Sequence, residues 1–138
     1  MEVAQMAPDR PGEMHDIQGN KQTPADCAVF LTAAPWVAAA RAALRQIETA
    51  GPTVKLVLLH GDGVLLALQQ THTGEADDLW SRLQAARQRH HFRLAACPVA
   101  ARRRGFLPVA REGLEWVGLP ELFTAAAVCP DWHCYAAP

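Results

Sequence analysis

Short apolar runs alternate with segments of helical period along most of the chain. Residues 27–34, 54–60 and 92–97 are nearly continuous apolar runs of strand length. Strands that are buried on both faces of a parallel sheet have this pattern. Shorter runs at 114–118 and 131–137 predict a fourth strand and a final strand at an edge of the sheet.

The segment between the first two runs predicts a helix. Pro35 suits the first position of a helix and Gly51 suits its end. Between them, apolar side chains recur at helical spacing and define one face, formed by Val37, Ala40, Leu44 and Ile47. We therefore expect this face to pack on the sheet.

Two further helices are predicted. Residues 75–91 are acidic at the start and basic at the end, which complements the helix dipole. Another helix begins near Pro120 and stops before Pro130. This order of elements predicts an α/β fold, a single Rossmann-like or flavodoxin-like domain whose mostly parallel sheet of about five strands has helices on both faces.

Composition narrows the class of protein. With 138 residues, half of them hydrophobic, the chain suits one globular domain. A formal charge of −1 gives no reason to expect nucleic acid or an anionic membrane as a direct partner. No secretory signal and no apolar window of roughly 18 residues is present. We expect a cytoplasmic protein without a cofactor.

The beginning of the chain differs from the rest. Residues 1–25 combine proline, glycine and polar side chains without an apolar period. Such a segment cannot bury enough surface to offset the entropy lost on ordering. We expect a flexible tail over residues 1–25 and the folded domain over residues 26–138.

Four cysteines offer candidate chemistry: Cys27, Cys97, Cys129 and Cys134. Without an export signal we expect them to be reduced. Cys129, His133 and Cys134 lie close in sequence, but their spacing does not match the usual zinc pairs, so no metal is expected. Cys27, Cys129 and Cys134 are interpreted as packing residues, because free cysteine often behaves as a small hydrophobe.

Cys97 differs from these cysteines by its position at the end of a predicted strand. Pro98 is preset for the first turn of a helix, so Cys97 would be its N-cap, where unpaired backbone N–H groups favour thiolate. Whichever of the next three arginines curls back toward the strand end would favour thiolate by direct charge, and these are Arg102, Arg103 and Arg104. A thiolate in such a place is a nucleophile.

The ends of the predicted strands bring further candidates to the same edge. In open parallel sheets, chemistry gathers at the carboxyl ends of the strands, where His60, Asp62 and Cys97 are expected to line one rim. Gly61-Asp62-Gly63 lacks the pattern of a phosphate loop and is typical of a tight turn with positive φ. His60 either hydrogen-bonds this turn or acts in the site.

The candidate chemistry reduces to few classes. A cysteine hydrolase needs a histidine base that no local signature assigns, and thioredoxin-like exchange needs a Cys-x-x-Cys pair that is absent. A single-cysteine carrier remains, with persulfide as its natural cargo. Two alternatives stay open: a non-catalytic assembly subunit in which Cys97 packs inertly, and a small-molecule or nucleotide binder at Gly61–Gly63.

Three segments carry a resemblance to a known family. In order, LLHGDGVLLAL, RLAACPVAARRRGF and GLEWVGLPELFTAA resemble segments of the DsrE/TusD family of sulfur-relay proteins, and the resemblance covers about residues 28–135. It implies a Rossmann-like sulfurtransferase subunit that carries a persulfide on Cys97. Some of Arg102, Arg103 and Arg104 would stabilise its anion.

The resemblance also implies partners. These are homologous subunits in a homo- or hetero-oligomer, an upstream sulfur donor and a downstream carrier protein of the DsrC/TusE type. The pathway is either thiolation of transfer RNA or dissimilatory oxidation of sulfur.

Overall fold

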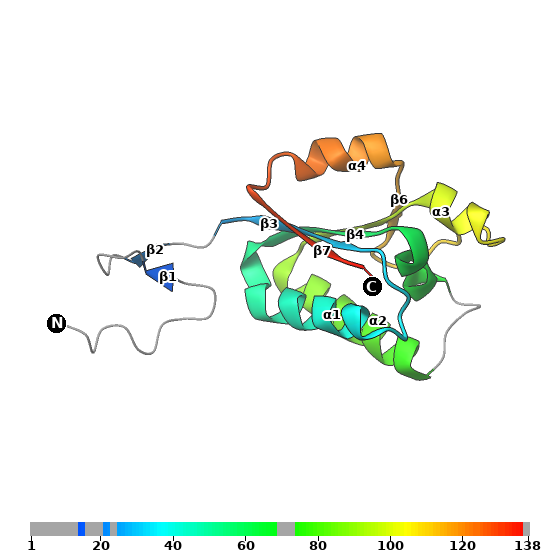
Figure 1. The fold of residues 1–138 in the computed structure, drawn as a ribbon, viewed down its shortest axis with the longest axis horizontal. Helices are drawn as coiled ribbons and strands as arrows, with labels where there is room; N and C mark the ends of the chain where they lie inside the picture. Colours follow the sequence, from blue (N-terminus) through cyan, green and yellow to red (C-terminus); the bar gives the residue numbers. More distant parts are fainter. Residues whose placement is uncertain (1–13, 16–20, 23–24, 69–73, 137–138) are drawn as a thin grey trace.

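One five-stranded sheet forms the centre of the molecule. A computed structural model gives the fold and describes residues 14–15, 21–22, 25–68 and 74–136. All four strand pairs are parallel, in the spatial order β6-β5-β4-β3-β7 (Figure 1). The strands are β3 (Cys27–Leu31), β4 (Val54–Leu59), β5 (Arg93–Ala96), β6 (Glu115–Trp116) and β7 (Asp131–Tyr135). The predicted α/β sheet is confirmed, including β7 at an edge.

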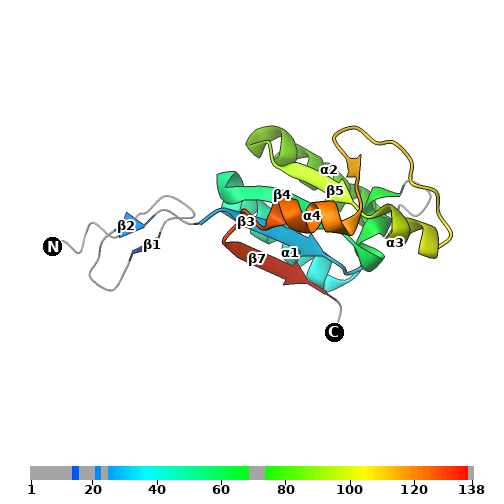
Figure 2. The same ribbon diagram turned by 90° about the horizontal axis from the view of Figure 1, so that it is seen from above.

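Helices cover both faces of this sheet, as predicted. Figure 1 shows α1 and α2 on one face and α4 on the other, and Figure 2 shows α4 lying over the sheet and running roughly along the strands. The α-helices are α1 (Ala38–Ala50), α2 (Gly74–His90), α3 (Pro98–Arg103) and α4 (Leu119–Ala126). Two 3-10 helices complete the domain, η2 (Gly51–Thr53) and η3 (Gly61–Ala67).

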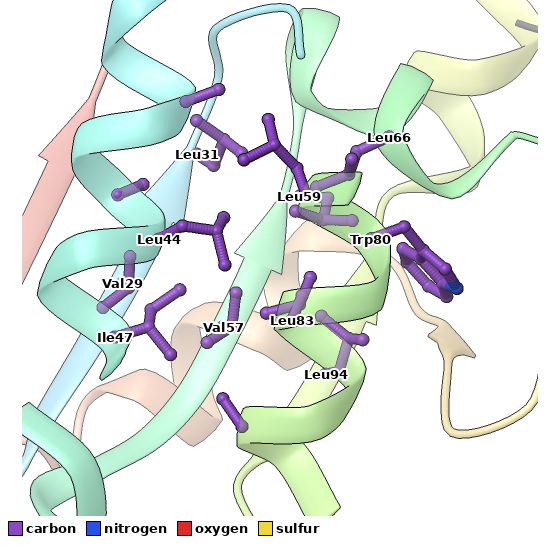
Figure 3. Packing of buried hydrophobic residues seen from close by; sticks show 14 of the residues in the cluster. Val29, Leu31, Leu44, Ile47, Val57, Leu59, Leu66, Trp80, Leu83 and Leu94 are labelled. Carbon is purple, nitrogen blue, oxygen red and sulfur yellow. The ribbon is translucent and has the colours of Figure 1, made fainter. Parts of the chain in front are cut away.

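The central strands bury side chains on both faces of the sheet. For this reason nearly all of their residues are apolar. Alternate residues of a strand point to opposite faces. One set packs beneath α1 and α2 (Figure 3), and it includes Val29, Leu31, Val57, Leu59 and Leu94. The other set packs beneath α4, and it includes Ala28, Phe30, Leu56, Leu58 and Ala95.

Helix α1 begins later than its sequence predicts. Ala40, Leu44 and Ile47 are buried, so the predicted face is confirmed. The predicted start at Pro35 is wrong, because the amide of Val37 donates to the carbonyl of Ala34 at 3.1 Å and closes a turn. Proline is favoured at the second position of such a turn, and the helix starts only after it.

Both other predicted helices are confirmed within a residue or two at their starts. Helix α2 begins at Gly74 and carries basic side chains in its last turn. Helix α4 begins at Leu119, with Gly118 as its N-cap and Pro120 in its first turn. None of the described helices is long and apolar enough to cross a bilayer.

The predicted tail falls largely outside the described residues. Within 1–25, the structure describes Ala25 and two short strands, β1 (Met14–His15) and β2 (Lys21–Gln22), which pair antiparallel. Two residues per strand are too few to produce a recognisable period in sequence.

The Gly61-Asp62-Gly63 segment forms the first turn of η3. Gly61 has a φ of 55°, as the turn prediction requires. Gly63 is required for a steric reason, because a Cβ at this position would clash with the backbone carbonyl of Leu31. The loop therefore lies directly against the end of β3, where a side chain cannot be accommodated.

Gly63→Ala tests this close approach. We expect a loss of about 1–3 kcal/mol in the free energy of unfolding, because the clashing carbonyl belongs to a buried strand and cannot move aside cheaply. Urea denaturation gives the measurement. Gly74→Ala is the matched control, since its Cβ would meet nothing within 4 Å and should change stability by less than about 0.5 kcal/mol. Equal losses in the two variants would contradict this assignment.

Candidate functional site

The ends of four neighbouring strands, β3, β4, β5 and β6, are joined by a row of three backbone hydrogen bonds. In each case the residue that follows one strand donates its amide to the carbonyl of the last residue of the neighbouring strand in the sheet. The three bonds run from His60 to Leu31 (3.0 Å), from Cys97 to Leu59 (3.1 Å) and from Val117 to Ala96 (3.0 Å). These bonds continue the parallel ladder past the strands. His60 and Cys97 therefore follow adjacent strands at one edge, as predicted.

A pocket of about 400 Å³ opens at this edge. It is bounded by the ends of β4 and β5, by α3 and by the start of α4. Its lining residues are His60, Gly61, Cys97, Val99, Ala100, Arg103, Arg104, Gly118, Leu119 and Pro120. One cysteine, two arginines and one histidine thus share a single concave surface.

Cys97 occupies the predicted N-cap of α3, with Pro98 as the first helical residue. Its backbone is held on both sides, since its amide donates to Leu59 and its carbonyl accepts from Ala101 at 3.3 Å. The helix has only six residues and no side-chain cap. Because so short a helix has a small macrodipole, the arginine side chains are the main source of positive charge here.

Cys97 lies between an apolar cluster and the arginine-lined pocket. The residue is only 2% exposed and packs with the apolar side chains of η3 and α3. An apolar surrounding disfavours a thiolate, whereas a nearby guanidinium favours it. Cys97 also lines the pocket to which Arg103 and Arg104 contribute.

The three consecutive arginines do not share one environment. Successive residues of a helix point about 100° apart, so three in a row cannot face the same way. Arg103 and Arg104 line the pocket, whereas Arg102 does not, although Arg102 and Arg103 are both exposed. The helix ends at Arg103 in a Schellman motif, in which the amides of Gly105 and Phe106 donate to the carbonyls of Arg102 and Ala101.

Asp62 reaches the pocket through Arg104. The Arg104 Nε donates to Asp62 Oδ1 at 2.7 Å, and its Nη1 donates to the carbonyl of Ala100 at 3.0 Å. These bonds fix the guanidinium between η3 and α3. Asp62 is not itself a lining residue, so the structure places it behind the arginine and not on the pocket surface.

His60 contributes to the site with two different groups. Its carbonyl accepts the amide of Gly63 at 2.9 Å and closes the turn, while the residue also lines the pocket. The turn is closed by the backbone of His60, and a role of its imidazole in the site stays a prediction. Burial lowers the pKa of His60, and the charges of Arg104 and Arg103 lower it further. The imidazole is therefore neutral at neutral pH, and the positive charge of the two arginines opposes its protonation.

A second, apolar pocket of about 230 Å³ adjoins the first and shares His60 and Leu119 with it. Its remaining lining residues are Phe30, Thr32, Leu58, Phe123, Trp132 and Cys134. The rings of Phe30 and Trp132 lie 5.0 Å apart, and Trp132 is 45% exposed. Sequence analysis missed this pocket because its aromatic side chains come from three elements that only the fold brings together.

The other three cysteines divide into two groups. Cys27 and Cys129 are buried in the two core clusters, and burial raises the pKa of both thiols. Their interpretation as packing residues is confirmed. Cys134 is exposed on edge strand β7, so its interpretation as a packing residue is wrong. Among the described residues, Cys129, His133 and Cys134 form no group able to hold a metal.

The start of α4 is a further part of the site that sequence analysis missed. Gly118, Leu119 and Pro120 line the pocket because β6 pairs with β5 and therefore ends beside Cys97. The rule that placed His60 and Cys97 at the rim applies to any parallel strand. Applied to the predicted strand at 114–118, it would have placed these residues at the same edge.

The fold and this pocket define an α/β protein with a cysteine at the carboxyl edge of its sheet. A sequence model described as the DsrE/DsrF-like family matches residues 28–129, which is well over half of the chain. The chain therefore belongs to the DsrE/DsrF-like family, as its resemblance indicated.

A solved structure shares the fold. The crystal structure of the ychN protein from E. coli superposes with a TM-score of 0.61 at 18% sequence identity, covering 80% of this chain and 99% of that chain. The search of curated proteins returned no match. Family membership indicates a role related to sulfur relay, and members of the family typically act in sulfur-relay complexes.

The pKa of His60 provides a test of the positive charge in the pocket. We expect Arg104→Gln to raise the pKa of His60, because it removes the charge that opposes protonation most strongly after burial. NMR titration of the imidazole gives the measurement. Arg102→Gln is the matched control and should leave the titration unchanged, so an equal shift in that variant would contradict the placement of the charges.

Proposed function

We propose that this protein is a sulfurtransferase subunit that carries a persulfide on Cys97 and transfers its outer sulfur to a downstream protein. One observation carries the proposal: Cys97 and two arginines line the same pocket, within the part of the chain that matches the DsrE/DsrF-like family. The pocket matters to this proposal because the donor and the acceptor must each reach the sulfur of Cys97 in turn.

The chemistry consists of two thiol exchanges. The Cys97 thiolate attacks the outer sulfur of a donor persulfide, whose S–S bond breaks as the donor thiolate leaves. An acceptor thiolate then attacks the outer sulfur on Cys97, and Cys97 leaves as a thiolate. Cys97 is ionised in both steps, first as nucleophile and then as leaving group. Arg103 and Arg104 stabilise that charge each time.

The remaining candidate residues support this chemistry indirectly. Asp62 holds Arg104 beside the pocket through the 2.7 Å ion pair, so it acts as a positioning residue. His60 stays neutral beside the two arginines and lines the pocket without adding charge. Arg102 is exposed and is available to an incoming partner.

The proposal includes partners and a location. The protein would assemble with homologous subunits in a homo- or hetero-oligomer, receive sulfur from an upstream donor in the cytoplasm, and deliver it to a carrier of the DsrC/TusE type. Family membership supports these partners. The exposed side chains of Phe123 and Trp132 offer apolar surface beside the site.

Mass spectrometry tests sulfur loading directly. After incubation with glutathione persulfide, we expect the peptide containing Cys97 to gain the mass of one sulfur atom. Cys97→Ser should abolish the gain, whereas Cys134→Ser, which alters the exposed cysteine, should retain it. Loading that persists in Cys97→Ser would overturn the assignment of the carrier cysteine.

A second candidate function is a non-catalytic assembly subunit. The 2% exposure of Cys97 and its apolar neighbours favour this alternative, in which the thiol packs inertly. The carrier proposal instead requires the charge of the arginines to outweigh the effect of burial.

Alkylation rates separate the two functions. For a carrier, we expect iodoacetamide to modify Cys97 readily at neutral pH, and the combined Arg103→Gln and Arg104→Gln changes to slow this reaction several-fold. Arg102→Gln should leave the rate unchanged. For a scaffold, Cys97 would react far more slowly than the exposed Cys134 and would not respond to any of these arginine changes.

A further inference from the structure

The geometry of the pocket restricts what can reach Cys97. The residue is only 2% exposed, and the pocket it lines has a volume of about 400 Å³. Since one liquid water takes up about 30 Å³, a molecule of a few non-hydrogen atoms fits there with room to spare. A folded partner, by contrast, must insert a narrow segment to reach the same sulfur. A small molecule is therefore the donor that reaches Cys97 most directly.

The charges of the pocket select the kind of molecule. Arg103 and Arg104 line it, and His60 adds no charge because its pKa is lowered. Asp62 offsets part of the charge through Arg104, but the bonds to Asp62 and Ala100 use only two of the N–H donors of that guanidinium. Among the described residues, no carboxylate forms an ion pair with Arg103. The pocket therefore favours an anion.

We propose that the pocket accepts a small sulfur dianion with a terminal sulfane sulfur, of which thiosulfate is the simplest, as a direct sulfur donor to Cys97. The inference rests on the proposed persulfide chemistry and names a substrate class for the same site. It adds a low-molecular-weight donor to the protein donor expected above.

The reaction balances without an oxidant or reductant. The Cys97 thiolate attacks the terminal sulfur of thiosulfate, a new S–S bond forms, and the S–S bond within thiosulfate breaks. Sulfite leaves with the electron pair of that bond. The products are the Cys97 persulfide anion and sulfite, and the total charge is the same on both sides.

The arginines have a specific part in this step. A thiolate and a dianion repel each other, so their approach requires compensating positive charge. Guanidinium groups bind tetrahedral oxyanions through paired N–H donors and also stabilise the negative charge that develops on departing sulfite. Arg103 and Arg104 lie on the same surface as Cys97 and can act on both charges.

Incubation of the full-length protein with thiosulfate tests the proposal with two readouts. We expect the Cys97 peptide to gain one sulfur atom and sulfite to appear in equal amount. Arg103→Gln and Arg104→Gln should each lower the loading rate by about tenfold or more, as loss of a charge-assisted hydrogen bond implies. Arg104→Lys should recover part of the rate, and Arg102→Gln should leave it unchanged.

Parallel loading with glutathione persulfide distinguishes the failures. Loading from glutathione persulfide but not from thiosulfate would overturn the thiosulfate proposal and leave the carrier function in place. Loading from neither donor would overturn the carrier function itself. A loss of thiosulfate loading in Arg102→Gln as large as in Arg104→Gln would overturn the assignment of the anion to this pocket.

Discussion

The parallel backbone ladder at the carboxyl edge of the sheet is the constraint on which the site depends. Its last bonds join the residue after each strand to the end of the neighbouring strand, which places His60 beside β3, Cys97 beside β4 and Val117 beside β5. These bonds involve only backbone atoms, so they do not require particular side chains at His60, Cys97 or Val117. The buried apolar faces of the strands keep water away from this ladder and so maintain it.

The proposed sulfur chemistry depends on how far Cys97 is buried and how close it lies to charge, and the backbone ladder sets only the position of this residue. It places Cys97 at the boundary between the apolar cluster of η3 and α3 and the arginine-lined pocket. A fully buried thiol would be protonated and inert, and a fully exposed one would react with any oxidant in solution. At this boundary the sulfur is almost fully shielded from solvent, while its residue lines the same pocket as two arginines.

Much of the fold follows from local sequence patterns, and much of the site does not. Continuous apolar runs predict the central strands, and the rule for strand ends then places His60 and Cys97 on one rim. The ion pair between Asp62 and Arg104 joins residues 42 positions apart, and no local pattern indicates it. The sequence also predicts that Pro35 starts a helix, whereas Pro35 lies in a turn. Proline suits both positions, and the hydrogen bond between Ala34 and Val37 that decides between them is visible only in the structure.

The helical period of α3 explains why an arginine run serves this site better than a single arginine. At about 100° per residue, consecutive side chains spread around the end of the short helix, so Arg103 and Arg104 line the pocket while Arg102 lies outside it. Under the proposed function, the same run would stabilise an anion inside the pocket and offer a charge to a partner outside it. Asp62 pairs with Arg104, whereas no carboxylate among the described residues forms an ion pair with Arg103, so only one of the two pocket arginines is tied to η3.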